Sequence, residues 1–340
     1  MKPTTAKKPA AEVLKDDSML KQKAMMAAHY ERLSSAPETG AKVCSTFVPG
    51  NLNELIMCFD LVNNLPEVNA IQSGLRKQSG GYIMEAERAG HSEDVCTYVK
   101  SDIGMMMKGN IGPNGKELPK PDVLLLSYTG CFTFLKWFEL LREQYKCPTI
   151  FMQTPYMADG KITKNMIDYM VKQFKEDVIP TLEQVSGVKF DIDRLRQYLA
   201  ESAKAEDDLV HVLQSAKNKP SPIDAYFGGI YYIGPIFGAF RGTDDAIDYY
   251  RFLRQEVDER VKLGLGPITP DGPMQEEKYR LGTLKRSMRS WARSLMSTFS
   301  KARLGRRGRN WCSRIQKYSQ RVMARGSLMV SSMACTLVCF

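Results

Sequence analysis

The stretch PDVLLLSYTG, residues 121–130, decides the fold class. A continuous apolar run follows a proline and ends at Thr-Gly, which is the pattern of a strand buried on both faces. The amphipathic stretch CFTFLKWFELLREQY (131–145) follows at once, and CPTIFMQTPY (147–156) has the pattern of the next strand. Because strands that alternate with helices form parallel sheets covered by helices on both faces, this region predicts an α/β fold.

The residues before this stretch continue the alternation. AKVCSTFVPG (41–50) predicts a strand that ends at Pro-Gly, and NLNELIMCFDLVNN (51–64) predicts a helix. EVNAIQ (67–72) predicts a second, short strand. We therefore expect an α/β domain over residues 18–158, which a disordered polar arm at residues 1–17 precedes.

The following region, residues 159–281, predicts a helical segment. Apolar residues spaced by three and four indicate amphipathic helices at residues 162–187, 191–217 and 243–264. Asp191 and Thr243 are suited to cap the second and third of these helices. Between them, residues 218–242 are apolar, aromatic and rich in glycine, so they could form a buried turn or line a pocket.

The positive charge of the chain is confined to its last part. The net charge is +10, yet residues 282–340 hold 13 Lys and Arg and no acidic residue, which leaves 35 basic and 38 acidic residues before them. This basic tail has no clean apolar period. It could bind nucleic acid or an anionic membrane, or it could be sequence translated in a shifted reading frame. The arginine-rich run 305–314 favours the shift, since CGN codons read one nucleotide later encode ordinary folded-protein residues. We therefore expect the chain to be truncated or frameshifted after about residue 281.

Several protein classes are excluded by composition and motifs. Eight cysteines in 340 residues are too few for a disulfide scaffold, and no secretory signal or run of eighteen apolar residues is present. These features predict a reduced, cytoplasmic protein without a membrane span, in which cysteines are metal ligands or packing residues. Neither a Walker A motif nor a G-x-G-x-x-G loop after a strand occurs, so any ATP hydrolysis would belong to a partner.

Two cysteines stand out from the others. Cys44, Cys58 and Cys147 lie in apolar surroundings and are expected to pack. In HSEDVCTYVK (91–100), by contrast, Ser92, Glu93 and Asp94 are helix-start signals that place Cys96 near a first turn, while Cys131 opens the helix after the buried strand. A helix start lowers the pKa of a thiol. Two thiolates beyond the ends of strands could therefore share one metal centre, or Cys96 could be a buried small hydrophobic residue.

Four stretches carry a resemblance to a known family: STFVPGNLNELIMCFDLVNNLPEVNA, HSEDVCTYVKSDIG, LLLSYTGCFTFLKWFELL and KITKNM. They resemble the 2-hydroxyacyl-CoA dehydratase superfamily and, within it, the B-type cluster-bearing subunits of ATP-dependent benzoyl-CoA reductases. The resemblance covers residues 18–281. It implies flavodoxin-like, Rossmann-like parallel sheet domains, of which the second would be missing here, and a [4Fe–4S] cluster held by three cysteines.

Cys96 and Cys131 match the first two of those cluster ligands. The third ligand belongs to the C-terminal α/β domain of the family, and Cys312, Cys335 and Cys339 lie in sequence that does not match it. We therefore assign only Cys96 and Cys131 as iron ligands and expect the chain by itself to be inactive. No catalytic residue is assigned.

The resemblance also implies partners and chemistry. It implies a homologous second cluster-bearing subunit, two ATPase or activator subunits that bind ATP and Mg²⁺, ferredoxin as electron donor, and benzoyl-CoA as the compound reduced to a cyclic dienoyl-CoA in anaerobic aromatic degradation. One alternative is a 2-hydroxyacyl-CoA dehydratase subunit, which eliminates water through a radical. Another is a non-catalytic protein that binds nucleic acid through its basic tail; this alternative is disfavoured, because all its support lies in residues 282–340.

Overall fold

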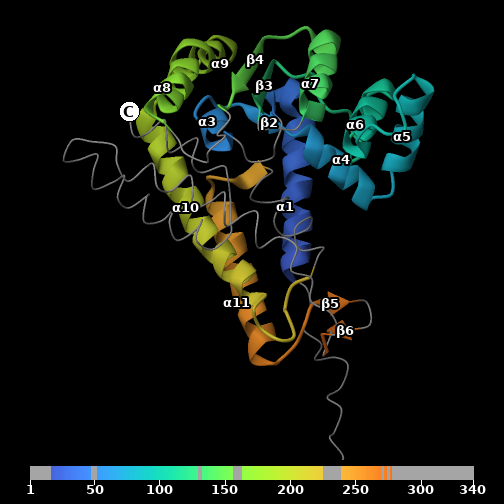
Figure 1. The fold of residues 1–340 in the computed structure, drawn as a ribbon, viewed down its shortest axis with the longest axis vertical. Coiled ribbons are helices and arrows are strands. Elements are labelled where there is room, and N and C mark those ends of the chain that lie inside the picture. The colour runs from blue at the N-terminus through green and yellow to red at the C-terminus, as the bar shows by residue number, and fades with distance from the viewer. Residues whose placement is uncertain are drawn as a thin grey trace, which may run out of the picture.

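The computed structural model describes most of the chain up to residue 277. The described residues are 17–46, 52–128, 132–155, 163–224, 239–269, 272–273 and 276–277. The expected N-terminal arm, the glycine-rich part of 218–242 and the basic tail therefore lie wholly or largely outside the described residues. In Figure 1, a sheet covered by helices forms the upper part, and long helices extend below it.

A four-stranded parallel sheet forms the centre of the upper part. Its strands are β1 (Val43–Thr46), β2 (Val62–Asn64), β3 (Val123–Tyr128) and β4 (Thr149–Gln153), in the order β2-β1-β3-β4. All three pairings are parallel, and β3 pairs with β1 through Ser45 and Leu124 and with β4 through Leu125 and Ile150. The order matches the first four strands of a flavodoxin-like sheet, so the predicted α/β class is confirmed.

Strand β3 is buried on both faces, as its unbroken apolar run predicted. Val123 and Leu125 point into one core, and Leu124 and Leu126 point into another. The first core is completed by the helical layer α8 (Lys164–Gln173), the π-helical turn η2 (Phe174–Val178), α9 (Ile179–Ser186) and α10 (Ile192–Ser215). The second core is completed by α5 (Ser79–Arg88), α6 (Thr97–Met107) and α7 (Phe132–Tyr145). Residues on both sides of position 158 thus share one core, while the domain boundary there stays a prediction.

The second strand is not where the sequence predicted it. EVNAIQ lies inside helix α4 (Pro66–Leu75), and the strand β2 precedes it. Pro66 occupies the first turn of α4, where its missing N–H costs nothing. The helix predicted for 51–64 is also too long, because α3 covers only Asn53–Met57 and Asp60 has a φ of 56° that ends the helical path.

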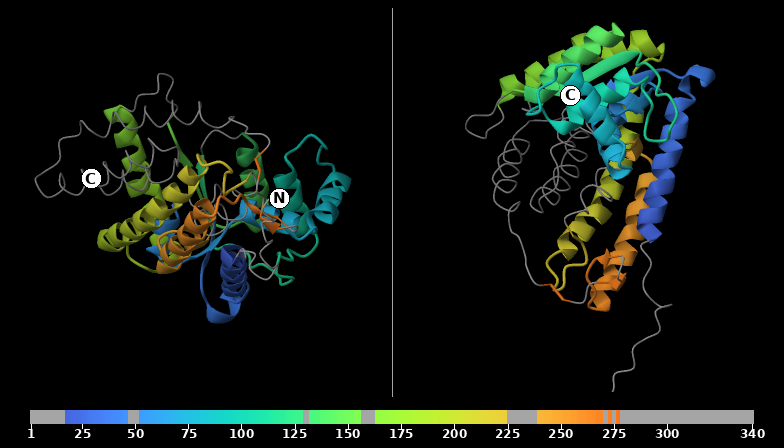
Figure 2. Two further views of the ribbon diagram at one scale, coloured as in Figure 1. Left: turned by 90° about the horizontal axis from the view of Figure 1, so that it is seen from below. Right: turned by 90° about the vertical axis from the view of Figure 1, so that its right-hand side faces the viewer.

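The long helices form the lower part of the molecule. Helix α11 (Asp244–Lys262) packs along α10, and helix α1 (Asp17–Ser34) contacts α11, as Figure 2 shows. Both predicted caps are confirmed: the Asp191 carboxylate accepts from the backbone N–H of Asp193, and the Thr243 hydroxyl accepts from that of Ala246. The short helix α2 (Ala36–Thr39) and the hairpin of β5 (Ile268–Thr269) and β6 (Gly272–Pro273) complete the described elements. Among the described helices, none is both long and apolar enough to cross a bilayer.

Candidate functional site

Cys96 occupies the N-cap position of helix α6. Its thiol is free and exposed, and its backbone has φ −45° and ψ 129°. No side chain at this position bonds the first N–H groups of the helix. Those N–H groups lie at the positive end of the helix dipole. The structure therefore places Cys96 where the sequence predicted it and leaves its sulfur accessible.

A buried lysine holds the turn that leads into Cys96. Lys100 is 3% exposed, and its ammonium donates to Glu87 Oε1 at 2.6 Å and to the backbone oxygen of Glu93 at 2.8 Å. The Lys100 backbone N–H donates to Cys96 O at 3.2 Å. In the same turn, the Asp94 N–H donates to the Ser92 hydroxyl at 3.3 Å. The HSEDV segment is thus fixed to both α5 and α6 before the cysteine.

Cys131 lies outside the described residues. The described chain resumes at Phe132, which begins α7, and it breaks after Tyr128, which ends β3. The prediction that Cys96 and Cys131 share a metal centre is therefore untested by the geometry. Within the described ranges, no three His, Cys, Asp or Glu side chains gather into a metal site.

The other described cysteines behave as the packing residues that the sequence predicted. Cys44 and Cys58 are fully buried, and Cys147 is partly buried. Burial raises the pKa of Cys44 well above its usual range and that of Cys58 to about 12, so both stay protonated thiols. A cysteine ligand of iron must have an accessible sulfur, and among the four described cysteines Cys96 is the exposed one.

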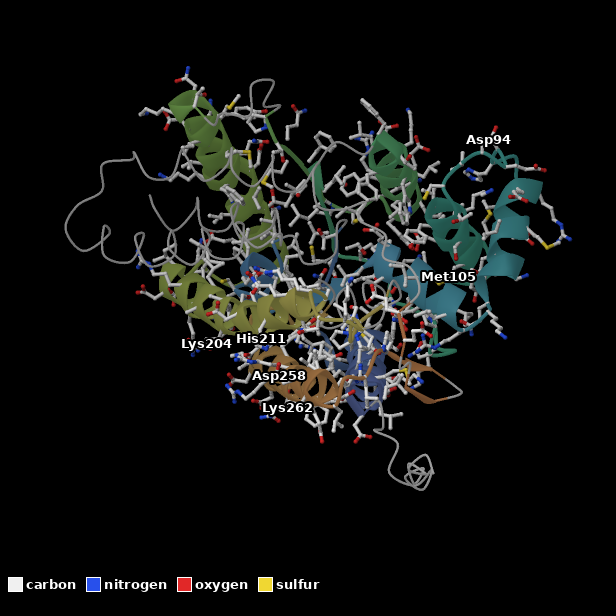
Figure 3. All side chains as sticks on the ribbon, turned by 60° about the horizontal axis from the view of Figure 1, so that its bottom comes forward. Asp94, Met105, Lys204, His211, Asp258 and Lys262 are labelled. Atoms are coloured by element: carbon white, nitrogen blue, oxygen red, sulfur yellow. The ribbon has the colours of Figure 1, made fainter. Side chains whose placement is uncertain are left out.

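The described histidines form no metal or base cluster. His29 is buried against Tyr30, and burial lowers its pKa to about 4. His211 of α10 faces Asp258 of α11 at 2.6 Å, far from the turn that contains Asp94 (Figure 3).

The carboxyl edge of the sheet is built of polar side chains. Asn64 donates to the Ser45 hydroxyl at 2.9 Å, and Asn69 donates to Asn64 Oδ1 at 2.9 Å. Tyr30 in turn donates to Asn69 Oδ1 at 3.0 Å. Ser45 and Asn64 lie at or next to the last residues of β1 and β2, where open α/β sheets bind their ligands.

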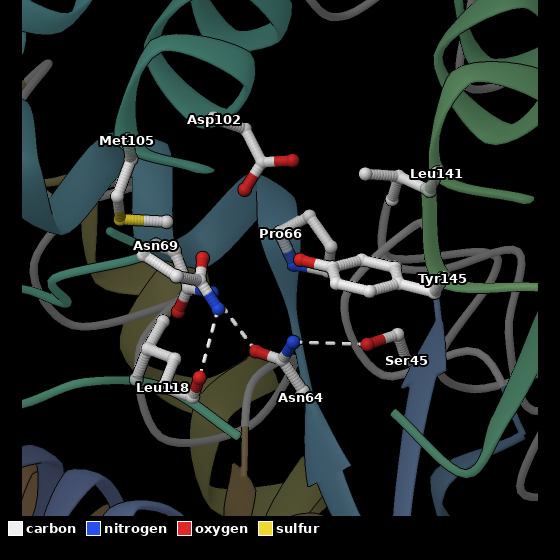
Figure 4. Close-up of a pocket in the computed structure, with 10 residues that line it drawn as sticks. Ser45, Asn64, Pro66, Asn69, Asp102, Met105, Leu118, Leu141 and Tyr145 are labelled. Atoms are coloured by element: carbon white, nitrogen blue, oxygen red, sulfur yellow. Dashed lines mark hydrogen bonds between the residues drawn. The ribbon is translucent and has the colours of Figure 1, made fainter. Parts of the chain in front are cut away.

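A small cavity lies beside this network, and Asp102 faces it. Figure 4 shows Asp102 and Tyr145 pointing toward the space that Asn64, Asn69 and Ser45 border. Burial raises the pKa of Asp102 to about 7, although a hydrogen bond from Trp137 Nε1 at 2.8 Å opposes that change. Asp102 was not found from the sequence, because an acid in the middle of a helix has no local signature of burial.

Glu67 is a second carboxyl group that was not found from the sequence. It lies in the first turn of α4, just after β2 ends, and burial raises its pKa to about 7. Burial raises the pKa of Tyr98, and electrostatic interaction with Glu67 and Cys96 adds to that rise, so the three groups lie in one neighbourhood. An acid directly after Pro66 was a usable signal, but assigning EVNAIQ to a strand concealed it. A carboxyl group that titrates near neutral pH can hold or release a proton there.

Replacing Asp102 with asparagine should flatten the pH dependence of stability. The pKa of this carboxyl is higher in the folded chain than its unperturbed value, so the folded state binds more protons and loses stability as pH rises from about 4 to about 7. The slope from one group is at most about 1.4 kcal/mol per pH unit. Urea unfolding of both proteins at pH 5 and pH 7 measures it.

Subtracting the unfolding free energy of the variant from that of the wild type cancels the contributions of the other titrating groups. Glu67 contributes in the same direction as Asp102, and His29 contributes in the opposite direction below pH 6.5, but both are present in each protein. An Asp102→Asn variant whose unfolding free energy keeps the wild-type slope between pH 5 and pH 7 would contradict the prediction.

Comparison with known proteins gives the family. The family model for the 2-hydroxyglutaryl-CoA dehydratase D-component matches residues 46–332. The B-type subunit of benzoyl-CoA reductase from Thauera aromatica is 73% identical over 79% of this chain and 62% of its own length. The (R)-2-hydroxyisocaproyl-CoA dehydratase alpha subunit of Clostridioides difficile is 29% identical over 76% of this chain and 60% of its own length. The (R)-phenyllactyl-CoA dehydratase alpha subunit of Clostridium sporogenes is 27% identical over 67% of this chain and 55% of its own length.

The chain spans about three fifths of the length of the curated relatives that it matches. The family match reaches residue 332, whereas the alignment with the reductase from Thauera aromatica covers 270 residues, and the expected frameshift after about residue 281 stays a prediction. The parallel sheet, the polar edge and the long matches agree: this chain belongs to the 2-hydroxyglutaryl-CoA dehydratase D-component family.

Proposed function

We propose that the chain is the B-type cluster-bearing subunit of an ATP-dependent benzoyl-CoA reductase. The observation that carries the proposal is the 73% identity to a B-type reductase subunit, against 29% or less to the dehydratase subunits. A [4Fe–4S] cluster, when bound, would supply electrons of low potential one at a time, and two electrons with two protons convert the aromatic ring of benzoyl-CoA to a cyclic diene. The chain acts in the cytoplasm as one part of a hetero-oligomer.

Cys96 and Cys131 are the iron ligands that this chain contributes. Cys96 supports the assignment because its sulfur is exposed at the start of a helix, where a ligand can reach it. Lys100 keeps the preceding turn fixed through Glu87 and the backbone of Glu93, so the Cys96 sulfur would be held in place to bind iron. Glu67 holds a proton near neutral pH in the neighbourhood of Tyr98 and Cys96.

The partners follow from the same proposal. A homologous second cluster-bearing subunit completes the site for benzoyl-CoA, and two ATPase subunits bind ATP and Mg²⁺ and pass on electrons from ferredoxin. The matched relatives are themselves named as subunits of larger enzymes. The absence of a Walker A motif from this sequence supports a division of labour in which another chain hydrolyses ATP.

The experiment that tests the proposal uses the chain assembled with its partner subunits under anaerobic conditions. With ATP and reduced ferredoxin, benzoyl-CoA should be consumed together with a stoichiometric amount of reductant. A 2-hydroxyacyl-CoA dehydratase, which the more distant relatives represent, would instead eliminate water from a hydroxyacyl-CoA without net reductant use. If the complex turns over a hydroxyacyl-CoA but not benzoyl-CoA, the reductase proposal is wrong and the chain is a dehydratase subunit.

Cys96→Ser in the same complex should abolish turnover and lower the iron affinity of this chain by more than about tenfold, since changes to second-shell groups alone cost 10–100-fold. Cys131→Ser should do the same. Cys147→Ser is the matched control. This partly buried cysteine precedes the amino end of β4, whereas the cluster is expected beyond the carboxyl ends of the strands. Iron and sulfide analysis measures the result, and full iron content in Cys96→Ser would overturn the ligand assignment.

A further inference from the structure

One buried hydrogen bond links the two helices that the proposed ligands precede. Helix α6 follows Cys96 directly and helix α7 follows Cys131 directly. Trp137 Nε1 of α7 donates to Asp102 Oδ2 of α6 at 2.8 Å. Asp102 lies six positions after Cys96, and Trp137 lies six positions after Cys131. The hydrogen bond therefore joins the two helices at the same number of residues from each cysteine.

Both partners of this hydrogen bond are removed from solvent. Trp137 is 1% exposed and packs with Val99, Ile103 and Leu141 in the core between β3 and the helices. Asp102 is 6% exposed and lies where this apolar core meets the polar cavity. The indole of Trp137 thus reaches from α7 to α6 through this hydrogen bond.

Stability alone does not explain a carboxyl group at this place. Burying a carboxyl in apolar surroundings costs free energy, and an apolar residue of similar size is commonly at least as stabilising. A buried polar pair, however, fixes one geometry where apolar side chains allow several. The pair thus gives α6 and α7 a defined relative position rather than additional stability.

We infer that Asp102 and Trp137 are positioning residues, which hold the starts of α6 and α7 at the spacing that lets Cys96 and Cys131 bind one cluster. The inference rests on the proposed function. Six residues of helix correspond to about 9 Å along the axis, so a small rotation at the hydrogen bond displaces both helix starts appreciably. The hydrogen bond is far enough from the sulfurs to act only through the helices.

The test measures the distance between the two cysteines without a cluster. The full chain, reduced and free of iron, is treated with a bis-maleimide that has a short phenylene spacer, and mass spectrometry of tryptic peptides measures the rate of Cys96–Cys131 cross-linking. Trp137→Phe removes the donor but keeps an aromatic ring. Asp102→Leu removes the acceptor, whereas the amide oxygen of Asp102→Asn still accepts from Trp137.

Trp137→Phe and Asp102→Leu should cross-link about tenfold more slowly than wild type. Loss of one buried hydrogen bond changes by about this factor the equilibrium between the helix arrangement that allows cross-linking and the arrangements that do not. Asp102→Asn should restore the wild-type rate. Leu141→Ala is the control for general destabilisation, because it opens a cavity in the same core without touching the hydrogen bond. Its cross-linking rate should stay at the wild-type value.

The outcomes separate this inference from the function on which it rests. Wild-type cross-linking rates in Trp137→Phe and Asp102→Leu, or an equal loss in Leu141→Ala, would overturn the positioning role while leaving the shared cluster intact. Absence of the Cys96–Cys131 cross-link in the wild-type chain would instead overturn the shared cluster itself.

Discussion

Arg241→Met should lower the free energy of unfolding by about 3–5 kcal/mol, the cost of leaving buried charges without their partner. The Arg241 guanidinium lies between two carboxylates, Glu54 and Glu206, and all three side chains are at most 2% exposed. Methionine has a similar length but no charge. The variant would therefore leave two carboxylates in the protein interior with no cation between them.

This ion cluster joins parts of the chain that are distant in sequence. Glu54 belongs to α3, Glu206 to α10, and Arg241 precedes α11. The Ser202 hydroxyl also donates to Glu54 Oε1 at 2.7 Å, and the Asn53 side-chain amide donates to the backbone oxygen of Arg241 at 2.7 Å. Loss of the guanidinium should thus loosen the long helices from the sheet as well as lower the unfolding free energy.

Urea denaturation followed by circular dichroism measures the change, and two further variants make it interpretable. Arg196→Met removes an exposed ion pair with Asp193 on the same helix α10 and should change the unfolding free energy by less than about 1 kcal/mol. Adding Glu54→Gln and Glu206→Gln to Arg241→Met should recover part of the loss, because neutral amides need no cation. No recovery would mean that the uncompensated charge is not the cause.

The sequence predicted those parts of the fold whose signals are local. The run of apolar residues in β3, the helix that follows it and the caps Asp191 and Thr243 are all confirmed. Each depends on residues within one element, where burial pattern and backbone hydrogen bonding determine the structure. The position of Cys96 at a helix start was predicted for the same reason.

The position of β2 could not be predicted in this way. The strand has three residues, two of which are asparagines, so it lacks the apolar pattern by which strands are found. Asn63 and Asn64 are nevertheless buried, because Asn64 bonds Ser45 and Asn63 bonds Asn53. The strand is selected by contacts with residues outside it, and such contacts leave no periodicity in the sequence.

In the candidate site, too, some residues have local sequence signals and others depend on contacts between distant parts of the chain. The two cysteines could be named from helix and strand signals together with the family resemblance. The groups around them depend on contacts across the fold: Lys100 with Glu87, and Asp102 with Trp137. The equal spacing of six residues from each cysteine to Asp102 and Trp137 acquires meaning only when the two helices are known to approach each other.

Gly104→Ala should also have a large effect, lowering the free energy of unfolding by about 3 kcal/mol or more, at the upper end of overpacking costs. Gly104 lies in α6 where this helix crosses α5. A Cβ atom added there would lie 1.8 Å from the backbone oxygen of Tyr82 and 2.5 Å from its carbonyl carbon. Because both atoms belong to the backbone, no change of side-chain conformation can relieve the clash.

Gly81→Ala is the matched control on the facing helix α5. A Cβ atom at Gly81 meets no atom within 4 Å, and alanine is favoured over glycine in a helix by about 0.5–1 kcal/mol. This variant should therefore be slightly more stable than wild type. Thermal and urea unfolding of the two variants measure effects of opposite sign, and a Gly104→Ala protein as stable as wild type would contradict the close crossing.

The Gly104→Ala protein also tests how rigidly α6 sets the position of Cys96. If some folded protein remains, α6 must have moved away from α5, since the Tyr82 backbone blocks the original position. That movement shifts the helix start that Cys96 caps and stretches the Asp102–Trp137 hydrogen bond. The Cys96–Cys131 cross-linking rate should therefore fall in the folded fraction of Gly104→Ala but not in Gly81→Ala. A glycine eight residues from the cysteine would then be as necessary for the ligand geometry as the residues beside the sulfur.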